Sequence, residues 1–345
     1  MITIDVPVQD APYQVLVGSG AINKLSDQLE KLLPTTKKVA VITDETVQGL
    51  YFDLLKNQLT TVDKEVVEYV VKPGEAAKSA ENYLAILTWL AEHDMTRTDA
   101  IVALGGGVVG DLAGFVAATY LRGVPYIQIP TTLLAMVDSS VGGKTAIDLP
   151  AGKNLVGAFY QPRLVVVDPD VLLTLPKQIL HDGYAEIIKY GMIGDAALLD
   201  ILSGDHDLTE IIARCIQIKS KIVCVDPFDT TIRNLLNFGH TIGHALELLS
   251  DFQLSHGQAV AIGMAVDARA AGNQALIGKL EQLLAKYKLP MTTTFTADEI
   301  FTYATRDKKR TGDTITNIVP VATGHCELQR ISMTDYHNWL KSGLE

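Results

Sequence analysis

The sequence AIVALGGGVVG, from Ala100 to Gly110, carries the clearest indication of the fold. The run Ala100–Leu104 predicts a buried strand, and glycines at positions 105, 107 and 110 spell G-x-G-x-x-G where an apolar helix begins and continues to about Tyr120. A glycine loop between a strand and a helix presents backbone N–H groups and a helix N-terminus to a diphosphate. The loop alone is weak evidence for a nucleotide, because glycine-rich turns also serve close packing.

The segments on either side of this stretch also alternate between strands and helices. A helix is predicted from Ser79 to His93, with Ser79 as its N-cap. Continuous Val and Ile runs separated by helices are typical of a largely parallel sheet that is covered on both faces. The further strands that we predict are Lys38–Asp44, Lys64–Val71, Tyr126–Pro130 and Leu164–Asp168.

The pattern changes after Thr174, where helical periodicity becomes dominant. Thr314–Arg330 is the exception, because it predicts a pair of strands. We therefore predict an α/β domain over residues 1–174 and a mainly α-helical domain over residues 175–345. The helices predicted in the second half are Pro176–Ile193, Leu208–Val225, Asn237–Ser250 and Ala259–Ala271.

Two phosphate-binding motifs are incomplete in this chain. The standard dinucleotide fold has an acid at the end of the strand after the glycine loop, but here that strand ends in Pro130-Thr131-Thr132, and the candidate acid, Asp44, lies upstream. This indicates a non-standard Rossmann-like site. The stretch Gly142 to Thr145 resembles the end of a P-loop, but Asp138 stands where that loop requires glycine, so we reject an ATPase.

Composition excludes several classes of function. The 345-residue chain has a net charge of −11, which argues against a nucleic-acid partner but leaves room for a small anion bound by a local cluster of Lys and Arg. Three cysteines without a CxxC motif argue against a disulfide framework and against a cysteine zinc site. With no signal-peptide pattern and no long apolar run, we expect a cytoplasmic protein that does not enter the membrane.

A metal site is indicated by one glutamate and three histidines. His240 and His244 stand four residues apart on a predicted helix, Glu186 lies on another predicted helix, and His256 follows in Leu254-Ser255-His256-Gly257. Two imidazoles and one carboxylate are typical of an open Zn²⁺ site that keeps positions for substrate oxygens. Spacing would pair His240 with His244, but it leaves open which three of the four groups bind the ion.

Eight motifs together, in this order, resemble the 3-dehydroquinate synthases, a family of sugar-phosphate cyclases. They extend from about residue 44 to residue 320, and in combination they are far more specific than the glycine loop. The motifs are Pro73-Gly74-Glu75-x-x-Lys78, Gly105 to Asp111, Pro130 to Leu133, Asp138 to Lys144, Gly152-Lys153-Asn154, Ala185-Glu186-x-x-Lys189-Tyr190-Gly191, Arg233-x-x-x-Asn237-x-Gly239-His240-x-x-Gly243-His244 and Asp307-Lys308-Lys309.

The resemblance implies NAD⁺ and one divalent ion, Zn²⁺ or Co²⁺, as cofactors. It implies that Glu186, His240 and His256 bind the ion and that His244 faces the substrate. The NAD⁺ residues that it implies are Asp44, Glu75, Lys78, Gly106, Gly107, Val108, Val109, Gly110, Asp111, Thr131, Thr132, Lys144, Lys153 and Thr174. The substrate residues that it implies are Asp138, Lys144, Asn154, Lys189, Lys219, Arg233, Asn237, His244 and one of Lys308 and Lys309.

The reaction implied by the resemblance converts 3-deoxy-D-arabino-heptulosonate 7-phosphate into 3-dehydroquinate and phosphate, in the shikimate pathway to aromatic amino acids. It combines a transient oxidation, phosphate elimination, reduction, ring opening and an aldol closure. Alternatives are another cyclase, such as 2-deoxy-scyllo-inosose synthase, a metal-dependent polyol dehydrogenase, or a non-catalytic scaffold. Arg233 and the pair Lys308-Lys309 favour a substrate with a carboxylate.

Arg122 raises the question of a dimer. It stands at the far end of the helix that begins at the glycine loop, on the order of 15 Å along the axis from the loop. An arginine there needs no function beyond the helix dipole. The resemblance nevertheless places it on the substrate phosphate and implies a homodimer, so we predict that Arg122 acts in the partner's active site. Two departures from the family are Asp229, where Glu is more usual, and Tyr184, where Met is more usual.

Overall fold

The computed structural model describes residues 1–304 and 310–345, so Lys308 and Lys309 lie outside the described residues. The chain forms two compact units. The first consists of Met1–Leu175 and Lys219–Pro227, and the second of Pro176–Ile218 and Phe228–Glu345. Helix α7 (Leu208–Val225) contributes residues to both units, so Lys219 belongs to the first unit although the sequence around it is helical.

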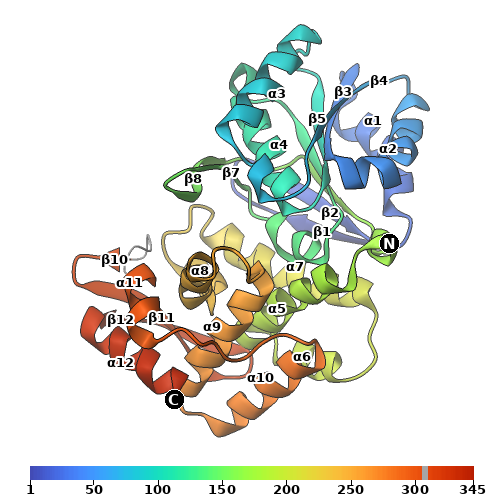
Figure 1. The fold of residues 1–345 in the computed structure, drawn as a ribbon. Helices are drawn as coiled ribbons and strands as arrows, with labels where there is room; N and C mark the ends of the chain where they lie inside the picture. The colour runs from blue at the N-terminus through green and yellow to red at the C-terminus, as the bar shows by residue number, and fades with distance from the viewer. Residues whose placement is uncertain (305–309) are drawn as a thin grey trace. The chain divides into compact units, whose positions relative to one another are not determined.

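A seven-stranded sheet forms the centre of the first unit (Figure 1). Only β1 and β2 pair antiparallel, while all other neighbours in this sheet are parallel. The predicted fold class, with a mostly parallel sheet in the first half and helices in the second, is confirmed. In sheet order the strands are β1 (Ile2–Val6), β2 (Tyr13–Val17), β9 (Leu164–Val167), β6 (Tyr126–Pro130), β5 (Ala100–Gly105), β3 (Lys38–Asp44) and β4 (Glu65–Val71).

Helices cover both faces of this sheet (Figure 1). Ala40 and Ala103 belong to the core formed with α3 (Ala80–Glu92) and α4 (Gly107–Thr119). Because successive side chains of a strand point to opposite faces, the alternate positions on these strands face α1 (Leu25–Leu32) and α2 (Glu45–Thr60). The side chain of Ser79 accepts a hydrogen bond from the backbone N–H of Asn82, which confirms the predicted N-cap of α3.

The helix that begins at the glycine loop ends earlier than predicted. α4 stops at Thr119, and a short turn, η3 (Tyr120–Arg122), follows it. Leu121 and Arg122 have φ angles of 48° and 69°, which are incompatible with a right-handed helix. Arg122 therefore lies in a left-handed turn beyond the helix, and not in its last turn.

The first unit also contains a separate two-stranded hairpin. It consists of β7 (Lys144–Leu149) and β8 (Gly152–Phe159), paired antiparallel. Short helical turns occupy the connections between the larger elements. They are η1 (Ala21–Lys24), η2 (Glu75–Ala77), η4 (Ala135–Ser139) and η5 (Pro169–Thr174).

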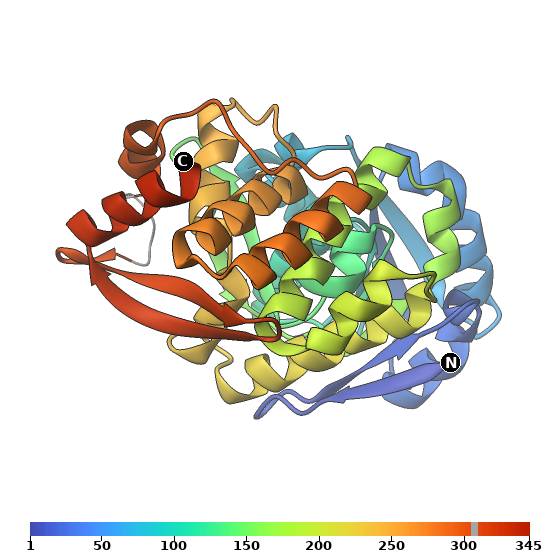
Figure 2. The same ribbon diagram turned by 90° about the horizontal axis from the view of Figure 1, so that it is seen from below.

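One buried helix, α9 (His256–Ala271), forms the centre of the second unit. It contacts α5 (Lys177–Gly194), α8 (His240–Leu249), α10 (Gln274–Lys286) and α12 (Met333–Leu344). The long antiparallel pair β11 and β12 lies beside these helices (Figure 2). The remaining elements are α6 (Ala196–Ser203), η6 (Ile232–Asn237), α11 (Ala297–Ala304), β10 (Arg310–Thr311), β11 (Thr314–Ala322) and β12 (His325–Ser332).

Two helices of the second unit begin elsewhere than predicted. α8 starts at His240 and not at Asn237, because Gly239 has φ 76° and interrupts the helical path. A Cβ at Gly239 would lie 2.7 Å from the carbonyl oxygen of Val260, so α9 can approach closely only because no side chain is present. α9 starts three residues before the predicted Ala259, at His256. His240 and His256 are thus each the first residue of a helix.

None of the helices in the described part of the chain combines the length and the apolar character that crossing a membrane requires.

Candidate active site

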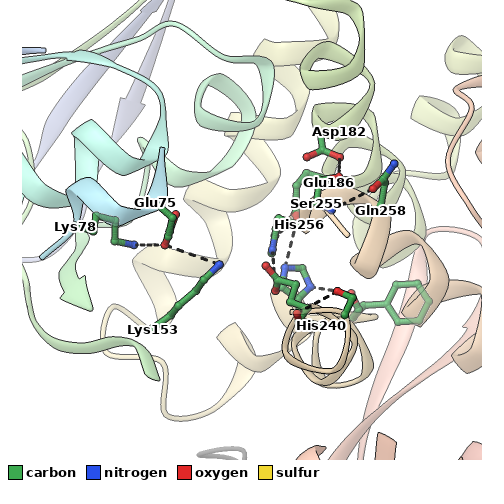
Figure 3. Close-up of polar contacts among 12 residues, drawn as sticks. Glu75, Lys78, Lys153, Asp182, Glu186, His240, Ser255, His256 and Gln258 are labelled. Atoms are coloured by element: carbon green, nitrogen blue, oxygen red, sulfur yellow. Dashed lines mark hydrogen bonds and ion pairs between the residues drawn. The ribbon is translucent and has the colours of Figure 1, made fainter. Parts of the chain in front are cut away.

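One carboxylate and two imidazoles converge in the second unit. Glu186, on α5, is completely buried, and its Oε1 lies 3.2 Å from the Nε2 atoms of both His240 and His256. The three residues each offer a ligand atom, and these atoms lie within 4.8 Å of one another. Figure 3 shows the three side chains pointing toward one another from α5, α8 and α9. This donor set matches an open site for a divalent ion.

The second ring nitrogen of each histidine has its own partner. His240 Nδ1 lies 3.0 Å from the carbonyl oxygen of Phe238. A carbonyl can only accept, so Nδ1 carries the hydrogen and Nε2 keeps its lone pair for a metal. His256 Nδ1 lies 3.6 Å from Oε2 of the buried carboxylate Glu247. Both rings are therefore oriented with Nε2 toward Glu186.

The electrostatics of this cluster favour a charged carboxylate. Burial opposes ionisation, but the ammonium of Lys189, which forms an ion pair with Oε2, and the two histidines hold the pKa of Glu186 well below its ordinary value. Burial lowers the pKa of His240. Burial also opposes a charge on His256, yet the hydrogen bond to Glu186 and the nearby carboxylate of Glu247 raise its pKa to about 10. In the metal-free protein, His256 is therefore protonated at neutral pH, and its positive charge lies beside the Glu186 carboxylate.

His244 differs from the other two histidines. It is exposed, and its ring centroid lies 5.5 Å from that of His240 and 6.2 Å from that of His256. Its ring nitrogen belongs to a second possible metal-binding group, which it forms with Glu247 and His256, whereas the group that contains Glu186 includes His240 and His256. The geometry therefore favours His256 over His244 as the partner of His240.

The glycine loop in the first unit leaves a helix N-terminus without a side-chain cap. Gly106 is the N-cap of α4 and makes no side-chain capping bond. Beside it, the backbone N–H of Thr131 donates to the carbonyl of Gly105 at 3.0 Å. The Oγ1 of Thr131 is buried and has no hydrogen-bond partner among the described residues. Open N–H groups next to an unused hydroxyl fit a phosphate-bearing ligand.

Several predicted cofactor residues meet at one buried lysine. Lys78 Nζ lies 2.9 Å from Asp111 Oδ2, 2.5 Å from Asn154 Oδ1 and 3.4 Å from Glu75 Oε1. Glu75 also faces Lys153 at 4.0 Å (Figure 3). Burial lowers the pKa of Lys78, but Asp111 and Glu75 more than compensate and raise it. The network ties predicted NAD⁺ residues to Asn154, a predicted substrate residue.

Other predicted residues have partners of their own. Lys219 Nζ lies 2.5 Å from Oδ1 of Asp138 and donates to its carbonyl at 2.7 Å. Asp44 caps α2 by accepting the N–H groups of Thr46 and Val47. The Thr174 hydroxyl lies 2.5 Å from that of Tyr51.

The remaining predicted substrate residues differ in exposure. Arg233, on η6, is almost completely buried, and Asn237 ends the same turn in a half-buried position. Lys144 is exposed at the start of β7, and Arg122 is exposed in its left-handed turn.

Sequence reasoning did not single out Glu247, Asp182 or Ser255, which lie around His256. A signal for Ser255 was present, because Ser255-His256-Gly257-Gln258 has the S-x-x-Q spacing of a capping box, and the structure forms that box. The pattern would have placed the start of α9 correctly. No comparable local signal marks Asp182, because its partners are more than seventy residues away in the sequence.

Two family models match adjacent parts of the chain. The model described as 3-dehydroquinate synthase N-terminal matches residues 68–182, and that described as 3-dehydroquinate synthase C-terminal matches residues 183–310. A 3-dehydroquinate synthase of Latilactobacillus sakei subsp. sakei (strain 23K) is 41% identical over 350 residues, which cover 99% of this chain and 98% of the relative.

Two solved structures of synthases have a similar fold. A 2-deoxy-scyllo-inosose synthase complexed with carbaglucose-6-phosphate, NAD⁺ and Co²⁺ superposes with a TM-score of 0.89 at 25% identity, over 99% of this chain and 100% of that one. The 2-epi-5-epi-valiolone synthase ValA from Streptomyces hygroscopicus subsp. jinggangensis 5008, with NAD⁺ and Zn²⁺ bound, superposes with a TM-score of 0.87 at 26% identity. The match covers 96% of this chain and 97% of that one.

The chain is a sugar-phosphate cyclase, because its sheet topology, its buried glutamate with two histidines and its likeness to these structures all agree with that class. The relatives and both family models assign it to one family within the class. The chain belongs to the 3-dehydroquinate synthase family. It is an enzyme with the activity of that family, which acts on a phosphorylated sugar.

Proposed function

We propose that this enzyme forms 3-dehydroquinate from 3-deoxy-D-arabino-heptulosonate 7-phosphate with NAD⁺ and one divalent ion, Zn²⁺ or Co²⁺. The observation that carries the metal assignment is the placement of Glu186 Oε1, 3.2 Å from the Nε2 atoms of both His240 and His256. When bound, the metal supplies Lewis acidity and NAD⁺ supplies reversible hydride transfer. What the chain contributes is binding, orientation and the movement of protons.

The metal ligands in this proposal are Glu186, His240 and His256. Lys189 forms an ion pair with Glu186 and thereby keeps the carboxylate charged before the ion arrives. The hydrogen bond from His240 Nδ1 to the carbonyl of Phe238 prevents the ring from presenting an N–H to the ion.

NAD⁺ is assigned to the first unit. The uncapped N-terminus of α4 at Gly106 and the unused hydroxyl of Thr131 are the groups that support a diphosphate there. Lys78 holds Asp111 and Glu75 in place from within the network, so its own role is to shape the site. Asp44, Thr132, Lys144, Lys153 and Thr174 remain predictions for the same cofactor.

The substrate residues in this proposal are mostly cations. Arg233, Lys189 and Lys219 are buried, and Lys189 and Lys219 form ion pairs with Glu186 and Asp138. Cations that are held in place by such carboxylates suit a substrate with both a carboxylate and a phosphate. Asp138, Asn154, Asn237 and Lys144 complete the set, and Lys308 and Lys309 remain predictions. His244, the exposed histidine of the metal cluster, is assigned proton transfer.

A C₂ homodimer with Arg122 acting in the partner's site belongs to the same proposal. Leu121 and Arg122 both hold left-handed backbone conformations, which are costly for non-glycine residues and are often found at functional sites. Tyr160, directly after β8, donates its hydroxyl hydrogen to the carbonyl of Val124 at 2.8 Å, so the end of β8 lies beside this turn. Phe159, at this end of β8, is 43% exposed, which supplies apolar surface for a partner next to Arg122.

Phosphate release under catalytic NAD⁺ tests the reaction. Purified protein with NAD⁺, Zn²⁺ and 3-deoxy-D-arabino-heptulosonate 7-phosphate is expected to release phosphate repeatedly per cofactor, without accumulation of NADH. Glucose 6-phosphate, which has the phosphate but no carboxylate, serves as the control. Release from glucose 6-phosphate instead would indicate a different cyclase, and stoichiometric NADH would indicate a polyol dehydrogenase.

A further inference from the structure

His256 is the least enclosed of the three proposed metal ligands. Its side chain is 31% exposed, compared with 9% for His240 and 0% for Glu186. Packing alone therefore restrains this ring less than it restrains the other two ligands. A half-exposed imidazole needs further contacts if it is to hold one orientation toward a metal.

The backbone around His256 is held by a carboxylate from another helix. Asp182, on α5, accepts a hydrogen bond from Ser255 Oγ at 2.5 Å (Figure 3). Burial raises the pKa of this carboxylate overall, although the backbone N–H groups of Gly257 and Gln258 favour its charged form and lower the pKa. The capping box adds a bond from the Ser255 N–H to Gln258 Oε1 at 3.1 Å. These contacts fix residues on both sides of His256.

α5 and α9 also touch at backbone distance beside this carboxylate. A Cβ placed on Gly257 would lie 2.3 Å from the carbonyl oxygen of Asp182, so only glycine permits the approach. Asp182 stands four residues before Glu186, which is about one helical turn. One face of α5 therefore carries both a metal ligand and the group that anchors the next ligand's backbone.

The ring of His256 is held from the opposite side. Glu247 stands seven residues after His240 on α8, about two turns along the same face, and is buried. Its Oε2 lies 3.6 Å from His256 Nδ1, while Nε2 faces Glu186. At 3.6 Å this is an electrostatic contact, and a negative carboxylate there favours the tautomer with hydrogen on Nδ1 and a lone pair on Nε2.

We infer that Asp182 and Glu247 are positioning residues for the metal site: Asp182 fixes the backbone on which His256 is carried, and Glu247 fixes which ring nitrogen faces the ion. Neither residue binds the metal itself. The inference rests on the ligand set proposed above, and it assigns the two acids to metal affinity and geometry.

Metal affinity, measured apart from catalysis, tests the inference. The metal-free protein and its variants Asp182→Asn, Glu247→Gln and Glu247→Ala are titrated with Zn²⁺ against a chromophoric chelator. The absorption spectrum of the Co²⁺ forms is recorded as a measure of ligand geometry. We expect each variant to bind one equivalent about 10–100-fold more weakly, as is typical when the outer partner of a ligating histidine is lost. Glu247→Gln, which keeps an accepting oxygen, is expected to lose less affinity than Glu247→Ala.

Asp195→Asn is the matched control. Asp195 is also a helix-capping carboxylate of the second unit, and it accepts the backbone N–H groups of Ala197 and Leu198 at the start of α6. The Asp195→Asn substitution should lower the melting temperature of the metal-free protein and leave its Zn²⁺ affinity and the Co²⁺ spectrum unchanged.

Three results would overturn the inference. One is unchanged Zn²⁺ affinity in both Asp182→Asn and Glu247→Ala. Another is a loss of affinity no larger than that of Asp195→Asn, which would reduce the role of the two acids to folding. The third is a second equivalent of Zn²⁺ that Glu247→Ala abolishes, because Glu247 would then be a ligand of a separate site with His244 and His256. Failure of the proposed ligand set is distinguishable, since Glu186→Ala would then bind Zn²⁺ as tightly as the unaltered protein.

Discussion

Asp182 and Glu186 lie about one turn apart on α5, and both hold the first turn of α9, Asp182 through Ser255 and Glu186 through His256. The distance between these two helices is set by Gly257, where the backbones meet without an intervening side chain. The geometry of the proposed metal site is thus inseparable from the packing of α5 against α9.

Gly257→Ala tests this dependence. The new Cβ would lie 2.3 Å from the Asp182 carbonyl oxygen, which belongs to the rigid backbone of a helix. We expect a loss of about 1–3 kcal/mol in the free energy of unfolding, the usual range for overpacking, together with weaker Zn²⁺ binding. Urea unfolding and chelator competition measure the two effects.

Gly278→Ala on α10 is its control. No atom lies within 4 Å of a Cβ placed there, so alanine should stabilise the protein by up to about 1 kcal/mol through its higher helix propensity. If Gly257→Ala and Gly278→Ala changed the free energy of unfolding and the Zn²⁺ affinity equally, the close contact between α5 and α9 would not be the cause of the losses in Gly257→Ala.

The metal-free protein should lose stability as the pH rises above neutrality. In the folded chain the pKa of His256 is about 10, whereas an unfolded histidine titrates near its ordinary value of about 6.5. Because the folded pKa is the higher one, the stabilisation is complete below about pH 6.5 and disappears as the pH approaches 10. Melting temperatures in the presence of a chelator should therefore fall across this range, and His256→Gln should flatten the curve. A melting temperature that rises with pH would contradict the assignment.

Lys78 is expected to be critical for the stability of the first unit. Its side chain is 3% exposed, and its ammonium lies between Asp111 and Glu75. Lys78→Met would leave Asp111, whose side chain is 21% exposed, without its cation, and we expect a loss of about 2–4 kcal/mol, below the upper end for a fully buried pair. Lys279→Met, which removes an ion pair to the exposed Asp200, should cost less than about 1 kcal/mol. Similar losses in both variants would argue that Lys78 has no special role.

Tyr184, where the family more often has Met, is expected to contribute stability through its ring. It stacks on Tyr287 with ring centroids 3.9 Å apart at 14°, and its hydroxyl lies 3.2 Å from His206 Nε2. Tyr184→Met should therefore destabilise the second unit, and a double-mutant cycle with Tyr287→Leu should give a coupling of about 0.5–1.5 kcal/mol. Additive effects would mean that the stacked arrangement contributes nothing beyond burial.

Arg122→Ala and Glu186→Ala form a complementation test of the proposed dimer. Each variant alone is expected to be inactive, one through loss of the arginine and the other through loss of a metal ligand. After subunit exchange, a mixed dimer contains one site with an intact metal cluster and the partner's Arg122, so part of the activity should return. If exchange is verified by mass and no activity returns, Arg122 acts within its own chain.

Local sequence patterns determined much of the first unit. The apolar runs of β3, β5 and β6 and the Ser79 cap are local features, since strand alternation and capping depend on residues only a few positions apart. β1 and β2 were missed, because a short antiparallel pair at a sheet edge has little pattern beyond its own few residues. The helix predicted from the sequence extends to Arg122, whereas α4 ends at Thr119, because residue types alone do not reveal the positive φ angles at Leu121 and Arg122.

The sequence by itself also presented four possible metal ligands and a resemblance that selected three of them. Spacing would have joined His240 to His244, whereas the folded chain places the Nε2 of His256 at 3.2 Å from Glu186, although seventy residues separate the two. Only tertiary structure decides such a pairing, because helix periodicity relates residues three or four apart, while the approach of α5, α8 and α9 depends on side chains that are absent at Gly239 and Gly257. Asp182 and Glu247 became visible for the same reason: a buried carboxylate acquires its role from the groups packed against it.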